Sequence, residues 1–379
     1  MIPPPSAMRD HTLPAAYSDA LDGLALAPLW TALHALLPNE RATPAVPHLW
    51  RWREVRPQVL EAARLVPMEQ AERRVLVLRN PGLGGAYAIT SSLFAGLQVI
   101  LPGETAPSHQ HTPAALRLIV EGRGAYTTVE GVKCAMEPGD LIITPPMRWH
   151  DHGHEGTEPV IWLDGLDIPL VRHFDAAWAS KMRPAQPPAT ATDPSQDELT
   201  AAGLVPRRSR YPRTGFPQVR WPWTTVRAAL ERLAATAPAG EPVTLRYVDP
   251  TSGAAIMPTL GAEACWLRPG ARLRAERRTA SAIFHVVEGQ GQSRVGDAVL
   301  TWERGDTFVA PPWHWIAHEV RGATACLVSF DDEPALRALG LYQEETDCDG
   351  GPRRAPQAPL GGSGRPGGAV APLVSPTDS

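Results

Sequence analysis

Residues 118–124 read Leu-Ile-Val-Glu-Gly-Arg-Gly, residues 138–146 read Pro-Gly-Asp-Leu-Ile-Ile-Thr-Pro-Pro, and both motifs return later in the chain. The second pair reads His-Val-Val-Glu-Gly-Gln-Gly at 285–291 and Arg-Gly-Asp-Thr-Phe-Val-Ala-Pro-Pro at 304–312. Each copy joins short apolar runs through glycine turns, which is typical of strands in a double-sheet jelly roll or a small barrel. The repeat therefore predicts two copies of one β-fold.

The glycines that precede the two copies support this interpretation. Gly103 and Gly122 have the same spacing as Gly270 and Gly289. A shared spacing, shared Gly-Asp turns and shared Pro-Pro ends are unlikely to coincide by chance. The predicted fold is mainly β, with two jelly-roll barrels in tandem after an N-terminal helical segment.

The rest of the chain divides around these two copies. Apolar residues at helical spacing over Leu24–Leu37 and Val55–Leu65 predict helices before the first copy, and a short helix is expected over Thr224–Ala235. Pro, Ala, Thr and Ser dominate 183–222, and Gly, Pro and Ser dominate the residues from Gly350 onward. We expect five segments: a helical arm (1–85), a first β-domain (86–182), a linker and helix (183–242), a second β-domain (243–345) and a disordered tail (346–379).

Composition limits the classes of function. The 379 residues carry a net charge of −4 with no basic stripe, so we expect no nucleic-acid partner. The four cysteines form no CxxC pair, which disfavours a zinc ribbon or a disulfide scaffold. No secretory signal is recognised, and no apolar run reaches the roughly 18 residues that span a bilayer. The sequence predicts a cytoplasmic protein that does not associate with membranes.

Three histidines of the first copy predict a metal site. His109 and His111 share one face of a strand, because alternate residues of a strand point the same way. His150 follows a later strand that can lie beside the first in a closed barrel. A lone His-x-His pair is weak support, since surface histidines pair by chance. The fixed glycine spacing, the Gly122 turn and the third histidine favour a divalent first-row metal.

The same residues resemble the first motif of the cupin superfamily, in which glycine, five residues, His-x-His, a glutamate and a glycine follow one another. Gly103, His109, His111 and Gly122 match this motif, whereas the glutamate position falls on Ala115. The usual carboxylate ligand is therefore missing, and the site consists of histidines alone.

Longer stretches resemble the gentisate 1,2-dioxygenase group of bicupin enzymes, from about residue 45 to 345. The matching stretches are Pro47-His-Leu-Trp-Arg-Trp52, Arg73-Arg74, Leu101-Pro-Gly-Glu-Thr-Ala-Pro-Ser-His-Gln-His-Thr112, Trp149-His-Asp-His-Gly153, Trp162-Leu-Asp-Gly-Leu-Asp-Ile-Pro-Leu170, Tyr247-Val-Asp-Pro250 and Gly340-Leu-Tyr342. The resemblance implies one Fe(II) per subunit, held by three histidines, and the insertion of O₂ into a small aromatic carboxylate.

In that group the ring opens between its carboxyl-bearing and hydroxyl-bearing carbons. The resemblance implies that gentisate, opened to maleylpyruvate, is the first candidate substrate. Salicylate, 5-nitrosalicylate and 1-hydroxy-2-naphthoate follow it, and a homotetramer is the expected assembly.

Two arginines are candidates for binding the substrate carboxylate. Arg117 lies eight residues after His109, and alternation along the strand places it on the same inward face. A planar guanidinium suits a carboxylate, although a structural ion pair with a buried acid is the alternative. Arg73 matches a second family position that helps to clamp the carboxylate.

Five further residues of the first copy are assigned to the site. His152 shares the face of His150 and could bond a ring substituent or move a proton; the alternatives are a histidine that supports the site from behind and a surface histidine. Asp164 could orient His152 or polarise the substrate, or be a strand-end turn residue. Phe94, Gly96 and Gln98 correspond to positions that line the substrate pocket, although Gly96 could equally be a strand glycine that admits close backbone approach. Phe94 stands where many members have Trp, which leaves the preferred ring substituent open.

The second copy lacks the three histidines. Counting from Gly270 and Asp306, the ligand positions fall on Glu276, Arg278 and Ile316. His314 and His318 remain nearby, and we expect them to be capped or surface residues. The second barrel is expected to be a scaffold and an assembly element.

Two other classes of function remain open. One is a redox-neutral cupin isomerase or hydrolase that uses zinc or manganese. The other is a cupin that binds a small ligand without catalysis, in which the histidines are dispensable. Metal analysis and oxygen consumption separate these classes from a dioxygenase.

Overall fold

The computed structural model describes residues 13–181, 191–192, 218–238, 241–270, 274–320, 322–348 and 353–354. It divides the chain into a unit of Met1–Pro44 and a unit of Ala45–Ser379. Most of the predicted linker and nearly all of the predicted tail lie outside the described residues. The expected five-segment division therefore stays a prediction.

The described part of the N-terminal unit, residues 13–44, holds three short helical elements: α1 (Ala15–Gly23), the 3-10 turn η2 (Leu29–Thr31) and α2 (Leu33–Leu36). The prediction of one helix over Leu24–Leu37 is wrong. Ala25 has a φ of 54°, which ends the preceding helix. Pro28 then precedes η2 in an extended conformation, which separates the two helical stretches.

The larger unit begins with two strands inside the segment that we expected to be helical, β1 (His48–Trp50) and β2 (Val75–Val77). Between them lie α3 (Trp52–Leu65), which confirms the helix expected over Val55–Leu65, and the short α4 (Met68–Ala71). The 3-10 turn η3 (Pro81–Leu83) leads into the first barrel.

Two six-stranded sheets form the first jelly roll, with strand orders β13-β8-β5-β10-β3-β2 and β11-β4-β9-β6-β7-β12. Their bounds are β3 (Phe94–Ile100), β4 (Thr105–His111), β5 (Ala115–Glu121), β6 (Ala125–Val129), β7 (Val132–Ala135), β8 (Leu141–Thr144), β9 (His150–His154), β10 (Val160–Leu166), β11 (Ala179–Lys181), β12 (Ala191–Thr192) and β13 (Arg220–Trp221). The helix α5 (Ile168–His173) follows β10.

The second jelly roll repeats this topology, with strand orders β1-β20-β17-β22-β15-β14 and β19-β18-β21-β16-β23-β24. Its strands are β14 (Val243–Arg246), β15 (Gly261–Leu267), β16 (Glu276–Arg278), β17 (Ala282–Glu288), β18 (Gln290–Val295), β19 (Ala298–Glu303), β20 (Thr307–Ala310), β21 (Ile316–Val320), β22 (Ala325–Asp331), β23 (Glu344–Thr346) and β24 (Arg353–Arg354). The helix α8 (Glu333–Ala338) follows β22 as α5 follows β10. The predicted repeat of one β-fold is confirmed.

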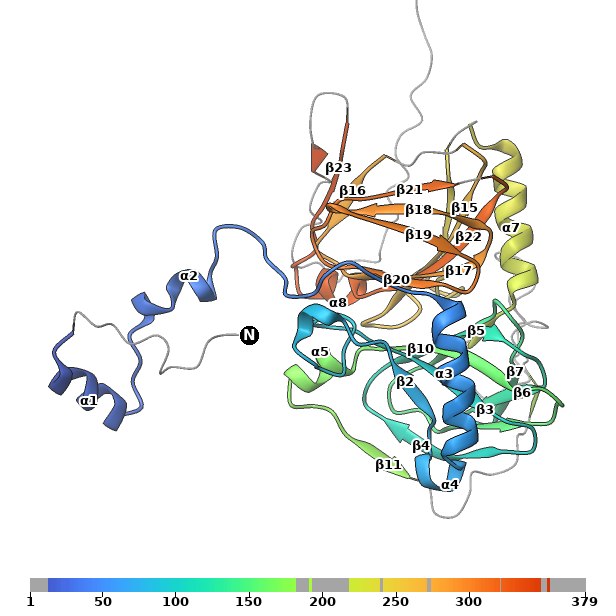
Figure 1. The fold of residues 1–379 in the computed structure, drawn as a ribbon, viewed down its shortest axis with the longest axis horizontal. Helices are drawn as coiled ribbons and strands as arrows, with labels where there is room; N and C mark the ends of the chain where they lie inside the picture. The colour runs from blue at the N-terminus through green and yellow to red at the C-terminus, as the bar shows by residue number, and fades with distance from the viewer. Residues whose placement is uncertain are drawn as a thin grey trace, which may run out of the picture. The chain divides into compact units, whose positions relative to one another are not determined.

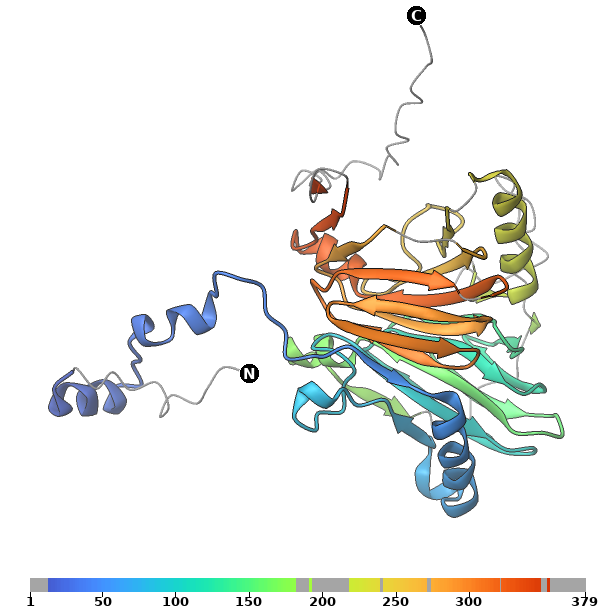
Figure 2. The same ribbon diagram turned by 45° about the horizontal axis from the view of Figure 1, so that its top comes forward.

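In each barrel, one edge strand comes from the chain segment that precedes the other barrel. β1 precedes the first barrel along the chain but pairs with β20 of the second, and β13 precedes the second barrel but pairs with β8 of the first. The helices that follow these strands are α3, which packs on β3, and α7 (Trp223–Thr236), which packs on β14 and β15. Figures 1 and 2 show α3 against the first barrel and α7 against the second.

The aspartates of the two Gly-Asp turns bind the segments that cross between the barrels. The carboxylate of Asp306 accepts the backbone N–H of Trp52 at 2.7 Å, and the carboxylate of Asp140 accepts the backbone N–H of Trp223 at 2.9 Å. A Cβ atom on the glycine before Asp140 would lie 2.5 Å from the Trp223 ring, and that glycine has a φ of 89°. The two turns need glycine because a tryptophan packs on each of them.

The predicted helix over Thr224–Ala235 is confirmed by α7. Within the part of the chain that the structure describes, no helix has the length and apolarity needed to cross a membrane.

Candidate metal centre

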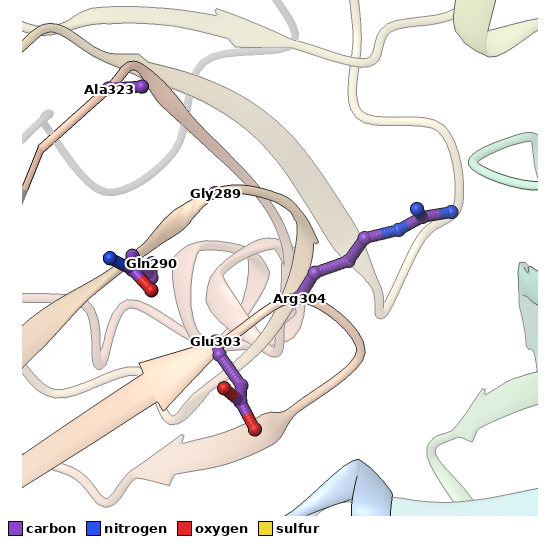
Figure 3. Close-up of a pocket in the computed structure, with 5 residues that line it drawn as sticks. All are labelled: Gly289, Gln290, Glu303, Arg304 and Ala323. Carbon is purple, nitrogen blue, oxygen red and sulfur yellow. The ribbon is translucent and has the colours of Figure 1, made fainter.

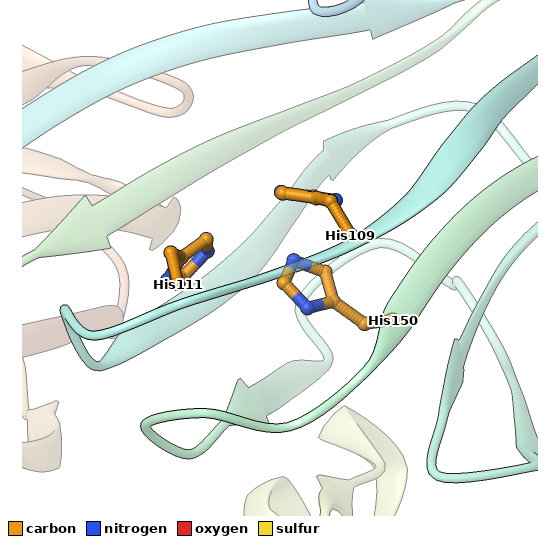
Figure 4. Close-up of side chains that lie close together, drawn as sticks. All are labelled: His109, His111 and His150. Carbon is orange, nitrogen blue, oxygen red and sulfur yellow. The ribbon is translucent and has the colours of Figure 1, made fainter. Parts of the chain in front are cut away.

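The three predicted histidine ligands converge between two neighbouring strands. His109 and His111 lie at the end of β4, and His150 begins β9, where it pairs directly with His109. One ligand nitrogen from each of the three rings lies within 4.8 Å of the other two. Figure 4 shows the three rings pointing toward one another from these two strands. The predicted proximity of the late histidine to the His-x-His pair is confirmed. The expected route is wrong, because the preceding strand β8 pairs with β5 in the other sheet and His150 instead begins the next strand, β9.

Backbone carbonyls fix the protonation of two rings. Nδ1 of His111 donates to the carbonyl of Pro113 at 2.7 Å, and Nδ1 of His150 donates to the carbonyl of Arg148 at 3.0 Å. A neutral imidazole that donates through Nδ1 leaves Nε2 with a free lone pair. Nε2 of His150 is buried and has no hydrogen-bond partner among the described residues. These rings fit a metal bound through Nε2.

His109 is held differently, because Nη2 of Arg73 donates to its Nδ1 at 2.5 Å and to the carbonyl of Pro107 at 2.7 Å. A guanidinium can only donate, so Nδ1 of His109 is the acceptor here. His109 adopts the tautomer of the other two rings only when Arg73 moves away from Nδ1.

Burial keeps all three imidazoles neutral. It lowers the pKa of His109 to about 2, with a further contribution from Arg73, and it lowers the pKa of His111 to about 4. The pKa of His150 is also lowered well below its usual value, chiefly by burial. Neutral imidazoles are the form that binds a metal. Ala115 starts β5 as a buried residue, so no carboxylate enters from the position where cupins carry glutamate.

Arg117 faces this cluster from the opposite sheet. It is buried on β5, its Nε lies 3.3 Å from Oδ1 of Asp164, and its Nη1 donates to Thr144 at 2.5 Å. Neither Nε of Arg117 nor Oδ1 of Asp164 has a well-aligned hydrogen bond. The inward position of Arg117 is confirmed, but alternation along one strand is the wrong reason. His109 and Arg117 lie on different strands, joined by the turn at 112–114.

Burial acts in opposite directions on this ion pair. It raises the pKa of Asp164 to about 6, against the opposing effects of Arg117 and Trp162. It lowers the pKa of Arg117, against the opposing effect of Asp164. A buried guanidinium with spare donor capacity is a suitable anchor for an anion.

Several buried polar atoms around the cluster lack partners within the described part of the chain. They are both ring nitrogens of His152 and Nε2 of Gln98. Nε1 of Trp162 also has no well-aligned partner, although it interacts with Asp164. The His152 and Trp162 rings are 5.3 Å apart, and Trp162 pairs across the sheet with Gln98. Burial lowers the pKa of His152 well below its usual value, so this ring is neutral and can both donate and accept.

The remaining predicted pocket residues lie on the strand that carries Gln98. Phe94 and Gly96 share its face of β3, and Gly96 pairs with Asp164. A Cβ atom on Gly96 would lie 2.5 Å from a methyl carbon of Val75, so β2 packs closely there. All ten predicted residues belong to the first barrel or to β2 and the turn before it.

Trp162 and Thr144 were not predicted as site residues. Trp162 lies two residues before Asp164 on β10, so strand alternation places both on one face and could have identified it. Thr144 ends β8, and no sequence pattern connects it with Arg117.

The second barrel replaces the metal ligands by an ion pair. Glu276 pairs with Ile316 across the sheet, as His109 pairs with His150. Nη2 of Arg278 lies 3.0 Å from Oε1 of Glu276. His318 is not a surface residue, because it is buried against Phe284 and Phe308. Its Nδ1 is capped by the hydroxyl of Ser293 at 2.7 Å.

The second barrel also has a surface hollow of about 440 Å³, lined by Gly289, Gln290, Glu303, Arg304 and Ala323 (Figure 3). None of these residues belongs to the histidine cluster. The hollow is therefore separate from the candidate metal centre.

A three-histidine cluster inside one of two tandem jelly rolls defines the class of protein as a bicupin with a candidate metal site in its first barrel. The family profile described as "Cupin domain" matches residues 96–166. The chain is 41% identical over 345 residues to a gentisate 1,2-dioxygenase of Ralstonia sp, covering 88% of this chain and 95% of that protein. It is 34% identical to a 5-aminosalicylate 1,2-dioxygenase of Comamonas sp, covering 87% and 89%.

Among solved structures, the fold matches a salicylate 1,2-dioxygenase from Pseudoaminobacter salicylatoxidans, described as an adduct with gentisate. The TM-score is 0.83 at 31% identity, and the match covers 90% of this chain and 97% of that chain. The chain belongs to the family of gentisate and salicylate 1,2-dioxygenases, which makes it a ring-cleaving dioxygenase.

Proposed function

We propose that the protein is an Fe(II)-dependent, extradiol-type dioxygenase that opens gentisate between its carboxyl-bearing and hydroxyl-bearing carbons to give maleylpyruvate. The observation that carries the proposal is the placement of Arg117 across from three neutral histidines. This arrangement offers one side for a metal and the other for a carboxylate. The name of the Ralstonia relative supports gentisate.

His109, His111 and His150 would hold the iron, one ion per subunit. Fe(II) supplies the redox-active centre at which an ortho-hydroxybenzoate and O₂ react. Three neutral ligands leave the dication uncompensated, which favours an anionic substrate with adjacent carboxylate and hydroxyl groups. The missing glutamate at Ala115 thus contributes to substrate choice.

Arg117 would bind the substrate carboxylate through guanidinium N–H groups that neither Asp164 nor Thr144 occupies, and Asp164 would hold the guanidinium in place. Arg73 would form the second half of the clamp. If Arg73 transferred its hydrogen bond from Nδ1 of His109 to the substrate carboxylate, the His109 imidazole could adopt the tautomer that binds the metal through Nε2. Binding of metal and substrate would then support one another.

His152 would accept or donate a proton at a ring substituent, because both of its nitrogens are unengaged in a buried position. Gln98 and Trp162 would offer further hydrogen bonds to the ring substituents. Phe94 and Gly96 would form the apolar wall. A wall of this kind also accommodates salicylate, 5-nitrosalicylate or 1-hydroxy-2-naphthoate, which are the alternative substrates.

Oxygen-electrode assays of the Fe(II)-loaded protein on a panel of hydroxybenzoates test this proposal. We expect one O₂ consumed per gentisate and the ultraviolet absorbance of maleylpyruvate. Iron and activity should be lost together in His109→Ala, His111→Ala and His150→Ala. No oxygen uptake with any member of the panel would refute the proposal and favour a redox-neutral or non-catalytic cupin.

The cytoplasmic location, the homotetramer and a role in aromatic catabolism are proposed from family membership. Size-exclusion chromatography with light scattering tests the assembly: a mass near four chains is expected, and a monomer would contradict it.

A further inference from the structure

Two buried aspartates join the barrels in a matched pair of contacts. Asp167 precedes α5 of the first barrel, and its Oδ2 accepts the hydroxyl of Thr259 from the second barrel at 2.5 Å. Asp332 precedes α8 of the second barrel, and its Oδ2 accepts the hydroxyl of Ser92 from the first barrel. Thr259 and Ser92 occupy equivalent positions, two residues before β15 and β3.

The second oxygen of each aspartate holds a turn in its own barrel. Oδ1 of Asp167 accepts the backbone N–H of Ala114 at 2.8 Å, and Oδ1 of Asp332 accepts the backbone N–H of Ser281 at 2.7 Å. Ala114 and Ser281 are again equivalent, because each immediately precedes the strand that follows the ligand positions.

Only in the first barrel is the peptide held by the aspartate also hydrogen-bonded to a proposed metal ligand. The N–H of Ala114 and the carbonyl of Pro113 belong to one peptide unit, and that carbonyl accepts Nδ1–H of His111 at 2.7 Å. Asp167 and His111 therefore hold opposite ends of the same peptide. In the second barrel the residue equivalent to His111 is Arg278, whose guanidinium pairs with Glu276 instead.

We infer that Thr259, a residue of the barrel without metal ligands, is a positioning residue for the metal centre of the first barrel. The hydroxyl of Thr259 orients Asp167, whose carboxylate accepts the N–H of the 113–114 peptide. Acceptance at the N–H strengthens the carbonyl of the same peptide as an acceptor, because hydrogen bonds in a chain polarise one another.

A stronger acceptor at Pro113 fixes the ring of His111 and keeps its proton on Nδ1. The lone pair of Nε2 then stays available and more basic, as partners behind metal-bound histidines are known to achieve. Asp167 is 2% exposed, so water does not compete for its oxygens. The second barrel thereby acts on metal affinity as well as on stability.

The inference rests on the proposed metal site, and metal affinity rather than turnover tests it. Metal-free protein is titrated with Co(II) against a competing chelator, for wild type, Thr259→Val and Ser92→Ala. Thr259→Val keeps the side-chain shape and removes the hydroxyl. Ser92→Ala removes the matching hydroxyl of the mirror contact, which leads to no metal ligand.

We expect the Co(II) dissociation constant to rise about tenfold in Thr259→Val, which is typical of partners behind a metal ligand. Ser92→Ala should stay within about twofold of wild type, since it lies outside the network that reaches the ligands. Thr259→Ser restores the hydroxyl and should restore the affinity. Thermal unfolding of the metal-free variants should fall by similar amounts in Thr259→Val and Ser92→Ala.

Equal metal affinities in Thr259→Val and Ser92→Ala would overturn the inference and leave both contacts as structural links between the barrels. If the valine variant does not fold, Asp167→Asn is tested instead. This variant keeps the acceptor at Oδ1 for Ala114 but replaces the oxygen that accepts the hydroxyl of Thr259. An unchanged Co(II) affinity in Asp167→Asn would also overturn the inference. If wild type binds neither Co(II) nor Fe(II), the proposed metal site itself is wrong.

Discussion

At the scale of single residues, the site depends on polar groups that burial has left without full partners. Arg117 and Asp164 are in contact at 3.3 Å without good hydrogen-bond geometry, and both are almost fully buried. A buried ion pair contributes little net stability when its desolvation is counted. An anion bound beside Arg117 would account for the presence of this pair in the pocket.

The Arg117→Ala variant tests that explanation. We expect the Michaelis constant for gentisate to rise roughly a hundredfold, because a charge-assisted bond to a carboxylate is lost from a buried site. The iron content should stay at one per chain, since Arg117 is not a ligand. Iron analysis of the same preparation is the control, and loss of iron would contradict the assignment of Arg117 to the substrate.

His285 predicts how the stability of the second barrel depends on pH. It is buried in the second barrel, bonded to Thr307, and burial lowers its pKa to about 4. The unfolded chain binds a proton at this residue near pH 6.5, whereas the folded chain does not. The stabilising contribution of neutral His285 is therefore complete above pH 6.5 and is lost as the pH falls toward 4.

Leu118 occupies the equivalent position of the first barrel, so His285→Leu is a conservative replacement. Relative to wild type, the variant should gain stability as the pH falls from 6.5 to 4, by at most about 3 kcal/mol. Denaturant unfolding of the metal-free proteins across this pH range measures the difference in unfolding free energy between variant and wild type. Groups that titrate equally in both proteins cancel in this difference. A difference that stays constant with pH would show that His285 does not titrate in this way.

At the scale of elements, the contact of β2 with β3 couples the pocket wall to Arg73. Gly96 lets a methyl group of Val75 approach, and Arg73 lies two residues before Val75. A side chain at Gly96 must displace Val75 of β2, because its Cβ would lie 2.5 Å from that methyl carbon and 3.3 Å from the backbone carbonyl oxygen of Leu76. The position of Arg73 should change with it.

Gly96→Ala should therefore destabilise the protein by about 1–3 kcal/mol and raise the Michaelis constant for gentisate. Val75→Ala removes the obstructing methyl groups, so the double variant should recover much of both losses. A coupling energy of about 1 kcal/mol or more is expected from this double-mutant cycle. Additive losses would show that the contact with β2 is not the cause.

At the scale of the whole molecule, the exchange of β1 and β13 makes the barrels depend on one another. The start of α3 is held by Asp306 of the second barrel, and the start of α7 is held by Asp140 of the first. Asp140 also pairs with Arg220 at 2.7 Å. Neither barrel is complete without a segment that belongs to the other.

We therefore expect scanning calorimetry of the metal-free protein to show one cooperative transition for both barrels. Asp140→Ala should lower its midpoint without splitting it, with a loss of roughly 3 kcal/mol for a broken buried pair. Asp306→Ala is the matched variant in the other barrel and should lower the same transition. Two separate transitions, of which each variant moves only one, would contradict this coupling.

The sequence alone was sufficient for the repeated β-fold, the convergence of the three histidines proposed as metal ligands and the absence of those histidines from the second copy. These features rest on strand alternation, glycine turns and fixed spacing, which are local properties of the chain. His109, His111 and His150 could be identified because a ligand set needs few residues of distinctive chemistry.

Tertiary structure alone decided the rest. Arg117 faces His109 from another sheet, β1 pairs with the opposite barrel, and Thr259 reaches Asp167 across the interface between the barrels. These contacts join residues far apart in the chain, and their side chains carry no periodic signal. Which hydroxyl meets which carboxylate depends on how two closed sheets pack together, and only the folded molecule determines that.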